Sequence, residues 1–542
     1  MQALIGPLQE LAEFEAIQKE KQKEAGVLQI SGCVNSQKTH MMYALGDGCK
    51  YIVIACSSES KARQVYEEYH MLDPETYFYP AKDFLFYQAD IRSKELQESR
   101  MTVVQAILEE KPLTVVVSFD AFMDALPVKG AMKDRVIRIE NGQTLDFDEI
   151  RKALTENGYD REEQVDGPGQ FAIRGGILDI YPLTGELPVR IELWGDEVDS
   201  IRSFDTDSQR SVQNLDEAVV YPADELPGRP VKRVSFLEYF PPEDTLVFLD
   251  EPARLVEKGE AVEQEFVEAQ AKRVESGYEV SDDEMELYET AEIVKQMNTY
   301  CCIGLSALDT HGNGFKFRNK FSINTKSVNP YNNSFEMLTR DLKRLKRNDY
   351  RVILLSGSRT RAKRLAEDLR DYNLSSYYSE EQDREVQPGE IMTAYGHVAE
   401  GYEYPMLKFT VISETDIFGK VRKKRKRKKY EGRKIRDFTE LKVGDYVVHE
   451  NHGVGIYQGI EKIESDKIAK DYMKISYAAG GNLYIPATQL DLIQKYASAD
   501  ARKPKLNRLG TQDWTRTRKR VKSAVQLIAK DLVKLYAARQ EQ

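Results

Sequence analysis

The chain has 542 residues, of which 41% are hydrophobic and 10% aromatic, and its formal net charge is −11. At about 150 residues per domain the length predicts three to four domains, and the composition excludes a fibrous repeat and a chain disordered throughout. No stretch approaches the about 20 apolar residues of a membrane span, and no secretory signal is recognised. Five irregularly spaced cysteines match neither a disulfide framework nor zinc spacing, so we expect reduced thiols in a cytoplasmic protein.

Residues 1–125 alternate short apolar runs with helical patterns. Tyr51–Cys56 and Leu113–Ser118 have the length of buried strands, and the stretches Ser60–Tyr69 and Ser93–Glu110 are helical in pattern. Because strands that alternate with helices pair in parallel, this region is predicted to be the first part of an α/β domain.

Residues 126–225 are richer in strand patterns. Val189–Trp194 and Val198–Phe204 are joined through a Gly-Asp turn, which predicts a β-hairpin. We therefore predict a β-rich module inserted into the α/β domain, which resumes over residues 226–320 with the strand Thr245–Leu249.

Residues 321–418 return to an α/β pattern. The stretches Ser334–Leu345 and Ser358–Leu369 are helical and flank the apolar run Tyr350–Ser356, and Phe409–Ser413 adds a further strand. This pattern predicts a further small α/β domain.

A strongly basic segment follows, in which nine of the ten residues from Lys420 to Lys429 are Lys or Arg. A run of like charges repels itself and stays solvated, so residues 419–436 are predicted to be a linker. Contact of this segment with nucleic-acid phosphates, or with an acidic face of the same chain, is the alternative.

Residues 437–500 read as a small all-β domain. Four short strand patterns in this span predict an SH3-like barrel: Asp445–Glu450, Gly455–Ile460, Tyr472–Tyr477 and Asn482–Ile485. His449 and His452 have no third ligand nearby, so no metal site is predicted. In residues 501–542 the apolar residues between Val521 and Leu535 share one helical face, which predicts a linker helix towards a further domain.

One segment is close to a phosphate-binding loop. Gly32–Thr39 (GCVNSQKT) matches the pattern GxxxxGK[ST] at Gly32, Lys38 and Thr39, but Gln37 replaces the glycine before the lysine. Glycine there lets consecutive backbone N–H groups approach the phosphates without a Cβ atom. We predict a degenerate loop that has lost hydrolysis; a chance match or an unusual intact nucleotide site are the alternatives.

A second segment, Val247–Glu251 (VFLDE), resembles a Walker B strand. In such a strand the carboxylates, here Asp250 and Glu251, would hold Mg²⁺ and a water molecule. Acids at strand ends are common, so this pattern alone is weak. No intact phosphate loop is found in the chain, and no catalytic residue is predicted.

Two longer stretches resemble known families. Gln170–Pro182 together with Val189–Ser211 is similar to the inserted domain shared by excinuclease component B and the bacterial transcription-repair coupling factors. Lys442–Ile460 and Asp471–Ile493 resemble the RNA-polymerase-interacting domain of the coupling factors, which CarD-like regulators also carry. The presence of both stretches in this order is specific to the coupling-factor family.

The resemblance implies a docking protein with two macromolecular partners. Excinuclease component A would bind the inserted module, and the RNA polymerase β subunit would bind an edge strand of the barrel. The candidate residues for excinuclease component A are Phe171, Arg174, Arg190, Glu192, Arg202, Phe204 and Asp205. The candidates for the polymerase are Tyr472, Met473, Lys474 and Ile475. Packing in a core is the alternative for Phe171, Phe204, Met473 and Ile475.

The family also implies an ATP- and magnesium-dependent DNA translocase, related to helicases, that binds double-stranded DNA and displaces polymerase from lesions. No such motor is identified in these residues, so no cofactor is predicted for them. Asp83–Ser93 leaves no room for the DNA-wedging hairpin of excinuclease component B. The alternatives are a CarD-like transcription regulator and a helicase of the component B type that is active on its own.

Overall fold

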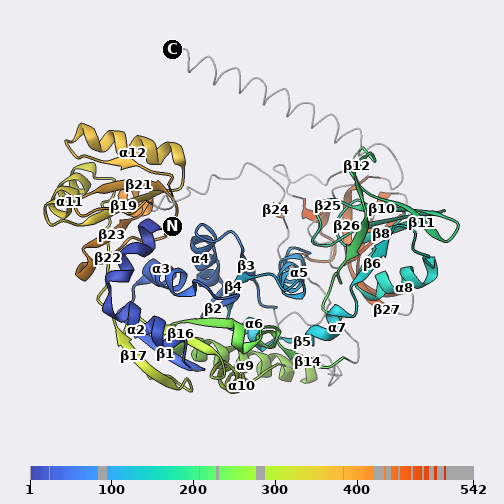
Figure 1. Cartoon of the computed structure of the whole chain (residues 1–542). Coiled ribbons are helices and arrows are strands. Elements are labelled where there is room, and N and C mark those ends of the chain that lie inside the picture. Colours follow the sequence, from blue (N-terminus) through green and yellow to red (C-terminus); the bar gives the residue numbers. More distant parts are fainter. Residues whose placement is uncertain are drawn as a thin grey trace, which may run out of the picture. The chain divides into compact units, whose positions relative to one another are not determined.

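The computed structural model describes most of the chain (Figure 1). The described residues are 2–82 and 94–419, without 24, 207, 227–230, 276–286, 310 and 382–383, and parts of 433–507. They divide into two compact units, one within residues 1–85 and 98–422 and the other within 86–97 and 423–542. Predictions for Asp83–Ser93, for the basic segment and for residues 521–535 lie outside the described residues.

A parallel seven-stranded sheet is the centre of the first unit. Its order is β17 (Phe317–Ser322), β1 (Gly26–Ser31), β16 (Cys301–Leu305), β15 (Thr245–Asp250), β2 (Tyr51–Cys56), β4 (Leu113–Ser118) and β3 (Thr76–Tyr79). Strands β15 and β16 enter between β1 and β2. Chain on both sides of the β-rich module therefore builds a single sheet.

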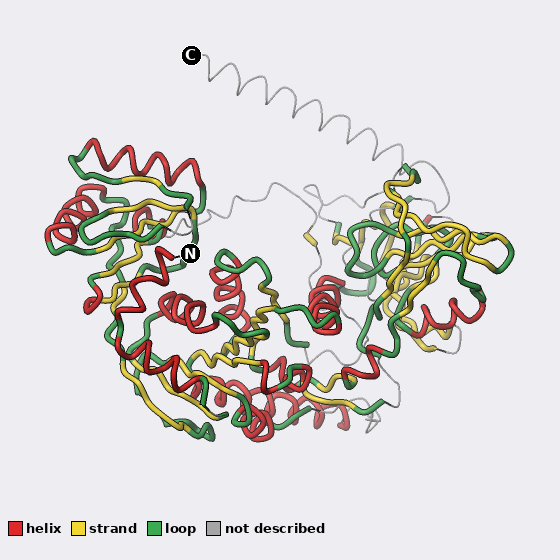
Figure 2. The backbone as a smooth tube through the Cα atoms, viewed as in Figure 1, coloured by secondary structure: helices red, strands yellow, loops and turns green. Residues whose placement is uncertain are grey.

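Helices cover both faces of this sheet (Figure 2). Ile52 and Ile54 of β2 belong to one hydrophobic core, and Val53 and Ala55 belong to the other, because successive side chains of a strand point to opposite faces. The first core also takes in α1 (Gln2–Ile5), α2 (Ala12–Lys21), α3 (Asn35–Gly46) and α4 (Glu59–His70). The second takes in α5 (Lys94–Leu108), α6 (Asp120–Met123), α9 (Pro252–Glu275) and α10 (Thr290–Met297). No described helix is long and apolar enough to span a bilayer.

The β-rich module is a six-stranded sheet with flanking elements. The order is β12 (Ser211–Leu215), β11 (Glu197–Phe204), β10 (Val189–Trp194), β9 (Ile177–Tyr181), β8 (Gln170–Arg174) and β7 (Asp160–Arg161). The predicted hairpin is present as β10 and β11, which pair antiparallel. The flanking elements are β5 (Ala125–Pro127), α7 (Lys129–Lys133), β6 (Ile137–Glu140), α8 (Phe147–Glu156), β13 (Glu217–Val220) and β14 (Arg233–Ser235).

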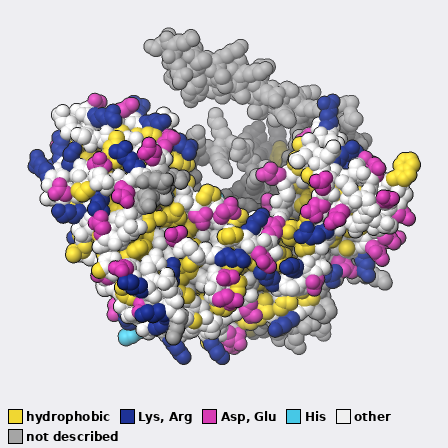
Figure 3. All heavy atoms as spheres, in the orientation of Figure 1, with side chains coloured by type: hydrophobic (Ala, Val, Ile, Leu, Met, Phe, Trp, Pro, Cys, Tyr) yellow, Lys and Arg dark blue, Asp and Glu magenta, His cyan; other side chains and the backbone are white. Residues whose placement is uncertain are grey.

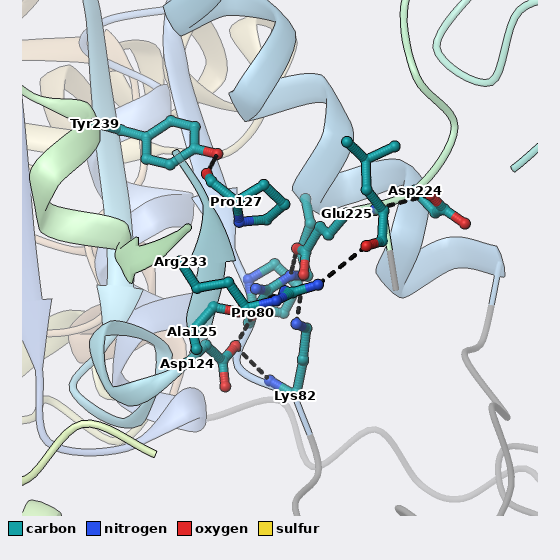
Figure 4. Close-up of polar contacts among 11 residues, drawn as sticks. Pro80, Lys82, Asp124, Ala125, Pro127, Asp224, Glu225, Arg233 and Tyr239 are labelled. Atoms are coloured by element: carbon teal, nitrogen blue, oxygen red, sulfur yellow. Dashed lines mark hydrogen bonds and ion pairs between the residues drawn. The ribbon is translucent and has the colours of Figure 1, made fainter. Parts of the chain in front are cut away.

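A buried ionic cluster lies where the chain enters and leaves the module (Figure 4). The guanidinium of Arg100, from α5, bonds Asp124 at 2.7 Å and Glu225 at 2.6 Å, and it donates to the carbonyl oxygen of Pro80. Asp124 directly precedes β5, which pairs with β14 on the returning chain. Burial raises the pKa of Asp124 despite the opposing effect of Arg100. The cluster thus connects α5 to the chain segment that enters the module at Asp124 and to the segment that leaves it at Glu225.

A mixed six-stranded sheet follows in the small α/β part of the first unit. Its order is β18 (Lys326–Ser327), β22 (Tyr402–Tyr404), β23 (Phe409–Ile412), β19 (Arg351–Ser356), β21 (Ile391–Tyr395) and β20 (Tyr377–Tyr378). Its helices are α11 (Phe335–Arg347), α12 (Arg359–Asp371) and α13 (Glu414–Phe418). Ile353 and Phe409 lie in the same hydrophobic core as Leu28 of the large sheet, so the two sheets share buried surface.

The second unit contains one described sheet of six strands. Its order is β24 (Arg433–Lys434), β29 (Ile493–Lys495), β25 (Tyr446–His449), β26 (Gly453–Ser465), β27 (Ile468–Ser476) and β28 (Asn482–Pro486). Antiparallel pairing of β27 with both β26 and β28 makes it an interior strand. The prediction that Tyr472–Ile475 lies on an edge strand is therefore wrong, and among the described strands β28 is the edge next to it.

Candidate functional site

The segment predicted to be a degenerate phosphate loop forms a short connection. Helix α3 begins at Asn35, within the motif, so Gly32–Val34 alone connects it to β1. Gly32 has φ +83°, and a Cβ atom there would lie 1.9 Å from the carbonyl oxygen of Ile323. The glycine is thus required by a close contact with the chain after β17.

Gln37, which replaces the motif glycine, is fully buried and bonded at both ends of its amide. Its Nε2 donates to the hydroxyl of Tyr404 at 2.9 Å, and its Oε1 accepts from the backbone N–H of Val34 at 3.2 Å. Tyr404 belongs to β22 of the small α/β part. The Gln37 side chain therefore connects α3, which packs on the large sheet, to β22 of the small α/β part.

Lys38 faces the two Walker B-like acids. Its Nζ lies 2.6 Å from Asp250 Oδ1 and 2.6 Å from Glu251 Oε1, and both Lys38 and Asp250 are buried. Burial alone would lower the pKa of Lys38, but the two carboxylates outweigh it and raise that pKa. The cation that would reach a phosphate is thus paired within the protein.

The remaining motif hydroxyl is also engaged. Thr39 Oγ1 donates to Glu68 at 2.8 Å, and Ser36 Oγ donates to the other oxygen of the same carboxylate at 2.7 Å. Glu68 in turn accepts from the backbone N–H of Ala399, in the small α/β part, at 2.9 Å. The positions of the motif thus contact protein groups that would compete with a nucleotide.

One face of the module sheet gathers several of the predicted interface residues. Arg190 is opposite Asp179 on β9 and opposite Arg202 on β11, so all three side chains share a face. Glu192 lies two residues after Arg190, and Arg174 lies two residues after Ala172, which is opposite Asp179, so both are on the same face. Asp179 is buried and accepts from Arg190 at 2.7 Å and from Arg174 at 2.8 Å. The hydrogen bond to Asp179 raises the pKa of Arg190.

Arg202, Glu192 and Asp205 also have partners within the module. Arg202 forms an ion pair with Glu192, which also accepts from Ser200. Asp205 accepts from the backbone N–H and the hydroxyl of Ser208, at 2.8 and 2.7 Å. Asp205 therefore stabilises the turn that follows β11.

Both predicted phenylalanines are buried, which corrects their assignment as contact residues. Phe171 packs on the opposite, core-facing side of the sheet with Leu178 and Ile180. Phe204 lies beneath the guanidinium of Arg190, whose carbon is 4.3 Å from the ring centroid. The alternating pattern of a strand does not reveal which face meets a core, so sequence left both possibilities open for each phenylalanine.

Trp194 was not among the predicted residues. It lies at the end of the β10–β11 hairpin and is 86% exposed. The neighbouring β8–β9 turn approaches it, since Leu193 N–H donates to the carbonyl oxygen of Gly176 at 2.8 Å. The signal was available in sequence, because the Gly195-Asp196 turn places a large aromatic residue at a hairpin tip.

The polymerase candidates in the second unit divide between two faces of β27. Met473 and Ile475 are fully buried and pack in one core with Val447 and Tyr457, so they are not available as surface contacts. Tyr472 and Lys474 are partly exposed on the other face. Lys474 Nζ bonds Glu461 on β26 at 2.7 Å.

The edge strand β28 offers a further aromatic residue. Tyr484 is opposite Lys474 and is partly exposed. Elsewhere in the sheet, His449 is buried beside His452. Burial is the main cause that lowers the pKa of His449 to about 3, and the charge of His452 adds to it. Among the described residues, no group of three or more His, Cys, Asp or Glu side chains could hold a metal ion.

Comparisons with known proteins agree with the two candidate docking regions. Residues 137–226 match the family model of the UvrB interaction domain, and residues 441–497 match that of the CarD-like/TRCF RID domain. Over 86% of its length the chain is 31% identical to a transcription-repair-coupling factor of Bacillus subtilis and 28% identical to one of Staphylococcus haemolyticus.

In both comparisons the chain spans 44% of the relative's length. The two family models occur in the order expected from the resemblance, one in the inserted module and the other in the second unit. The chain is therefore a relative of the transcription-repair-coupling factors that corresponds to less than half of their length.

Proposed function

We propose that this chain is an adaptor in transcription-coupled DNA repair. It binds stalled RNA polymerase through the sheet of the second unit, and it recruits excinuclease component A through the inserted module. The observation that carries the proposal is the presence of both family domains on one chain. A CarD-like regulator would leave the module without a purpose, and a helicase of the component B type would need a free phosphate loop.

The surface for excinuclease component A is the polar face of the module sheet and its turn end. Arg174, with a side chain 44% exposed, and Trp194 lie at the same end of adjacent hairpins. Arginine and tryptophan are enriched among the residues that dominate binding energy, because they combine large contact area with directional bonds. Asp179 holds Arg174 and Arg190 in place, which reduces the entropy lost on binding.

The surface for RNA polymerase is the edge strand β28 of an SH3-like barrel. An edge strand has unpaired backbone groups that add to a sheet of a partner, here one in the polymerase β subunit. Tyr484 of β28 and Tyr472 and Lys474 of β27 share the outer face and supply side-chain contacts. Met473 and Ile475 support this strand from the core.

The degenerate loop binds no nucleotide in this proposal. Lys38 is paired with Asp250 and Glu251, and the buried Gln37 amide is bonded to Tyr404. A triphosphate would have to break these buried contacts. ATP, magnesium and most of the contact with double-stranded DNA belong to the translocase of the longer family members.

A paired binding assay tests the adaptor. We expect Trp194→Ala to weaken binding of excinuclease component A by about tenfold or more while polymerase binding is unchanged. Tyr484→Ala should weaken polymerase binding and spare excinuclease binding. Val212→Ala changes another exposed apolar residue, on β12 of the same module sheet, and it should affect neither partner. Retained binding of excinuclease component A by Trp194→Ala, or loss of both partners with either variant, would contradict the assignment.

A further inference from the structure

Helix α11, in the small α/β part, has two chemically distinct faces. Leu338, Leu342 and Leu345 are buried in the core of this part, and the hydroxyl of Ser334 caps the helix by accepting from the N–H of Met337. The opposite face carries four cations: Arg340, Lys343, Arg344 and Arg347. Figure 3 shows Lys and Arg side chains, interspersed with Asp and Glu, over the part of the molecule that holds α11 and α12.

These cations line a surface hollow of about 590 Å³, which we call the α11 groove. Glu336 is the acidic residue among those that line it, and Tyr372 at the end of α12 forms part of the wall. The Tyr372 side chain is 46% exposed, and its ring centroid is 5.2 Å from that of Phe335. The groove therefore combines a cationic wall with an exposed aromatic ring.

The positive charge of the groove is largely uncompensated. Arg344 bonds Asp341 at 2.6 Å, whereas the described part of the chain shows no ion pair for Arg340, Lys343 or Arg347. Cations in a last helical turn stabilise the macrodipole, which accounts for Arg344 and Arg347 but not for the two cations before them. The chain as a whole has a net charge of −11, so this cluster does not reflect its general composition.

We propose that the α11 groove contacts the phosphate backbone of double-stranded DNA. Arg340 and Arg347 are seven residues apart, which corresponds to about 10.5 Å along a helix, so their side chains can reach separate phosphates of one DNA strand. The forked guanidinium of arginine matches phosphate geometry.

The lining itself favours a polyanion. Four of the eight residues that line the groove are cations and one is an acid, and double-stranded DNA carries closely spaced phosphates. This contact would be separate from both docking regions, and it would hold the adaptor near the DNA beside its partners.

The test is binding of the full chain to a labelled random-sequence DNA duplex of about 30 base pairs, followed by fluorescence anisotropy between about 50 and 200 mM salt. The triple variant Arg340→Gln, Lys343→Gln and Arg347→Gln should bind about tenfold or more weakly. Its slope of log affinity against log salt should be smaller by about 2 to 3, because up to three phosphate contacts are lost. Thermal unfolding should change little, because all three side chains are exposed and loss of the Arg347 charge from the last helical turn costs at most about 1 kcal/mol.

The matched control, Lys152→Gln, Lys295→Gln and Lys316→Gln, removes the same charge from positions elsewhere in the chain and should retain its affinity and slope. The basic segment is intact in every variant, so its own contribution cancels. An equal loss in the control, or an unchanged slope in the groove variant, would overturn the proposal. Unchanged DNA binding with lost binding of polyglutamate would assign the groove to an acidic protein instead.

Discussion

Lys38 illustrates how a single position in a familiar motif can acquire another role. Its flexible chain and point charge suit a phosphate, but the same properties let it bridge Asp250 and Glu251 in a buried site. A buried ion pair is weak evidence for stability, because desolvation offsets most of the attraction. Its clearer consequence is for binding, since a ligand would have to replace two short contacts.

His40 provides a pH-dependent test at the same site. Its Nε2 donates to the Leu4 carbonyl oxygen at 2.8 Å, because a carbonyl oxygen can only accept. Its Nδ1 then accepts from the hydroxyl of Tyr404 at 3.0 Å, so the ring is neutral. Burial lowers the pKa of His40 to about 4, despite the hydrogen bond to Leu4. An unfolded histidine has a pKa near 6.5, so between about pH 6.5 and 4 the unfolded chain takes up a proton that the folded chain excludes.

We therefore expect the contribution of His40 to the free energy of unfolding to be greatest above about pH 6.5 and to fall by up to about 3 kcal/mol as the pH falls to about 4. Urea denaturation of His40→Gln should show a weaker pH dependence than the unaltered chain in this window. His449 titrates in the same direction but is common to both proteins, so its effect cancels. Identical pH profiles for both would show that His40 is not kept neutral by folding.

At the scale of elements, the attachment of the inserted module depends on Arg100. This residue connects α5 to the chain before β5 and to the chain that returns through Glu225. We expect Arg100→Met to destabilise the protein by about 3 kcal/mol, because it removes the cation that both buried carboxylates share and leaves Lys82 as their remaining cation. Amide hydrogen exchange in β5 and β14 should rise.

The matched variant is Arg138→Met on β6, which removes an exposed pair with Glu217 in the same module. Exposed pairs contribute at most about 1 kcal/mol, so this variant should unfold almost as the original does. Equal effects of Arg100→Met and Arg138→Met would exclude a special role for the cluster at the base of the module.

At the scale of the whole first unit, the two α/β parts are expected to unfold together. Phe409 of β23 is fully buried in the core that also contains residues of β1 and α3. We expect Phe409→Ala to cost about 3 to 5 kcal/mol and to reduce hydrogen-exchange protection in α3 as well as in β23.

Leu365→Ala on α12 is the control, because Leu365 packs in the separate core of the small α/β part. It should weaken protection in α11 and α12 more than in α3. Protection of α3 that is unaffected by Phe409→Ala would mean that the shared core does not couple the two parts.

Local spacing in the chain predicted most of the helices and strands, and it carried the similarity to the coupling factors. Apolar runs such as Tyr51–Cys56, the hairpin turn at Gly195-Asp196 and the altered motif at Gln37 depend on local spacing, which can be read directly. Tertiary structure decided which side of each strand is buried and which strands are edges. It placed Phe171 and Ile475 in cores, made β27 an interior strand and left Trp194 exposed. The physical reason is that burial and strand order depend on contacts between residues far apart in the chain, whereas helix and strand periodicity depends on near neighbours.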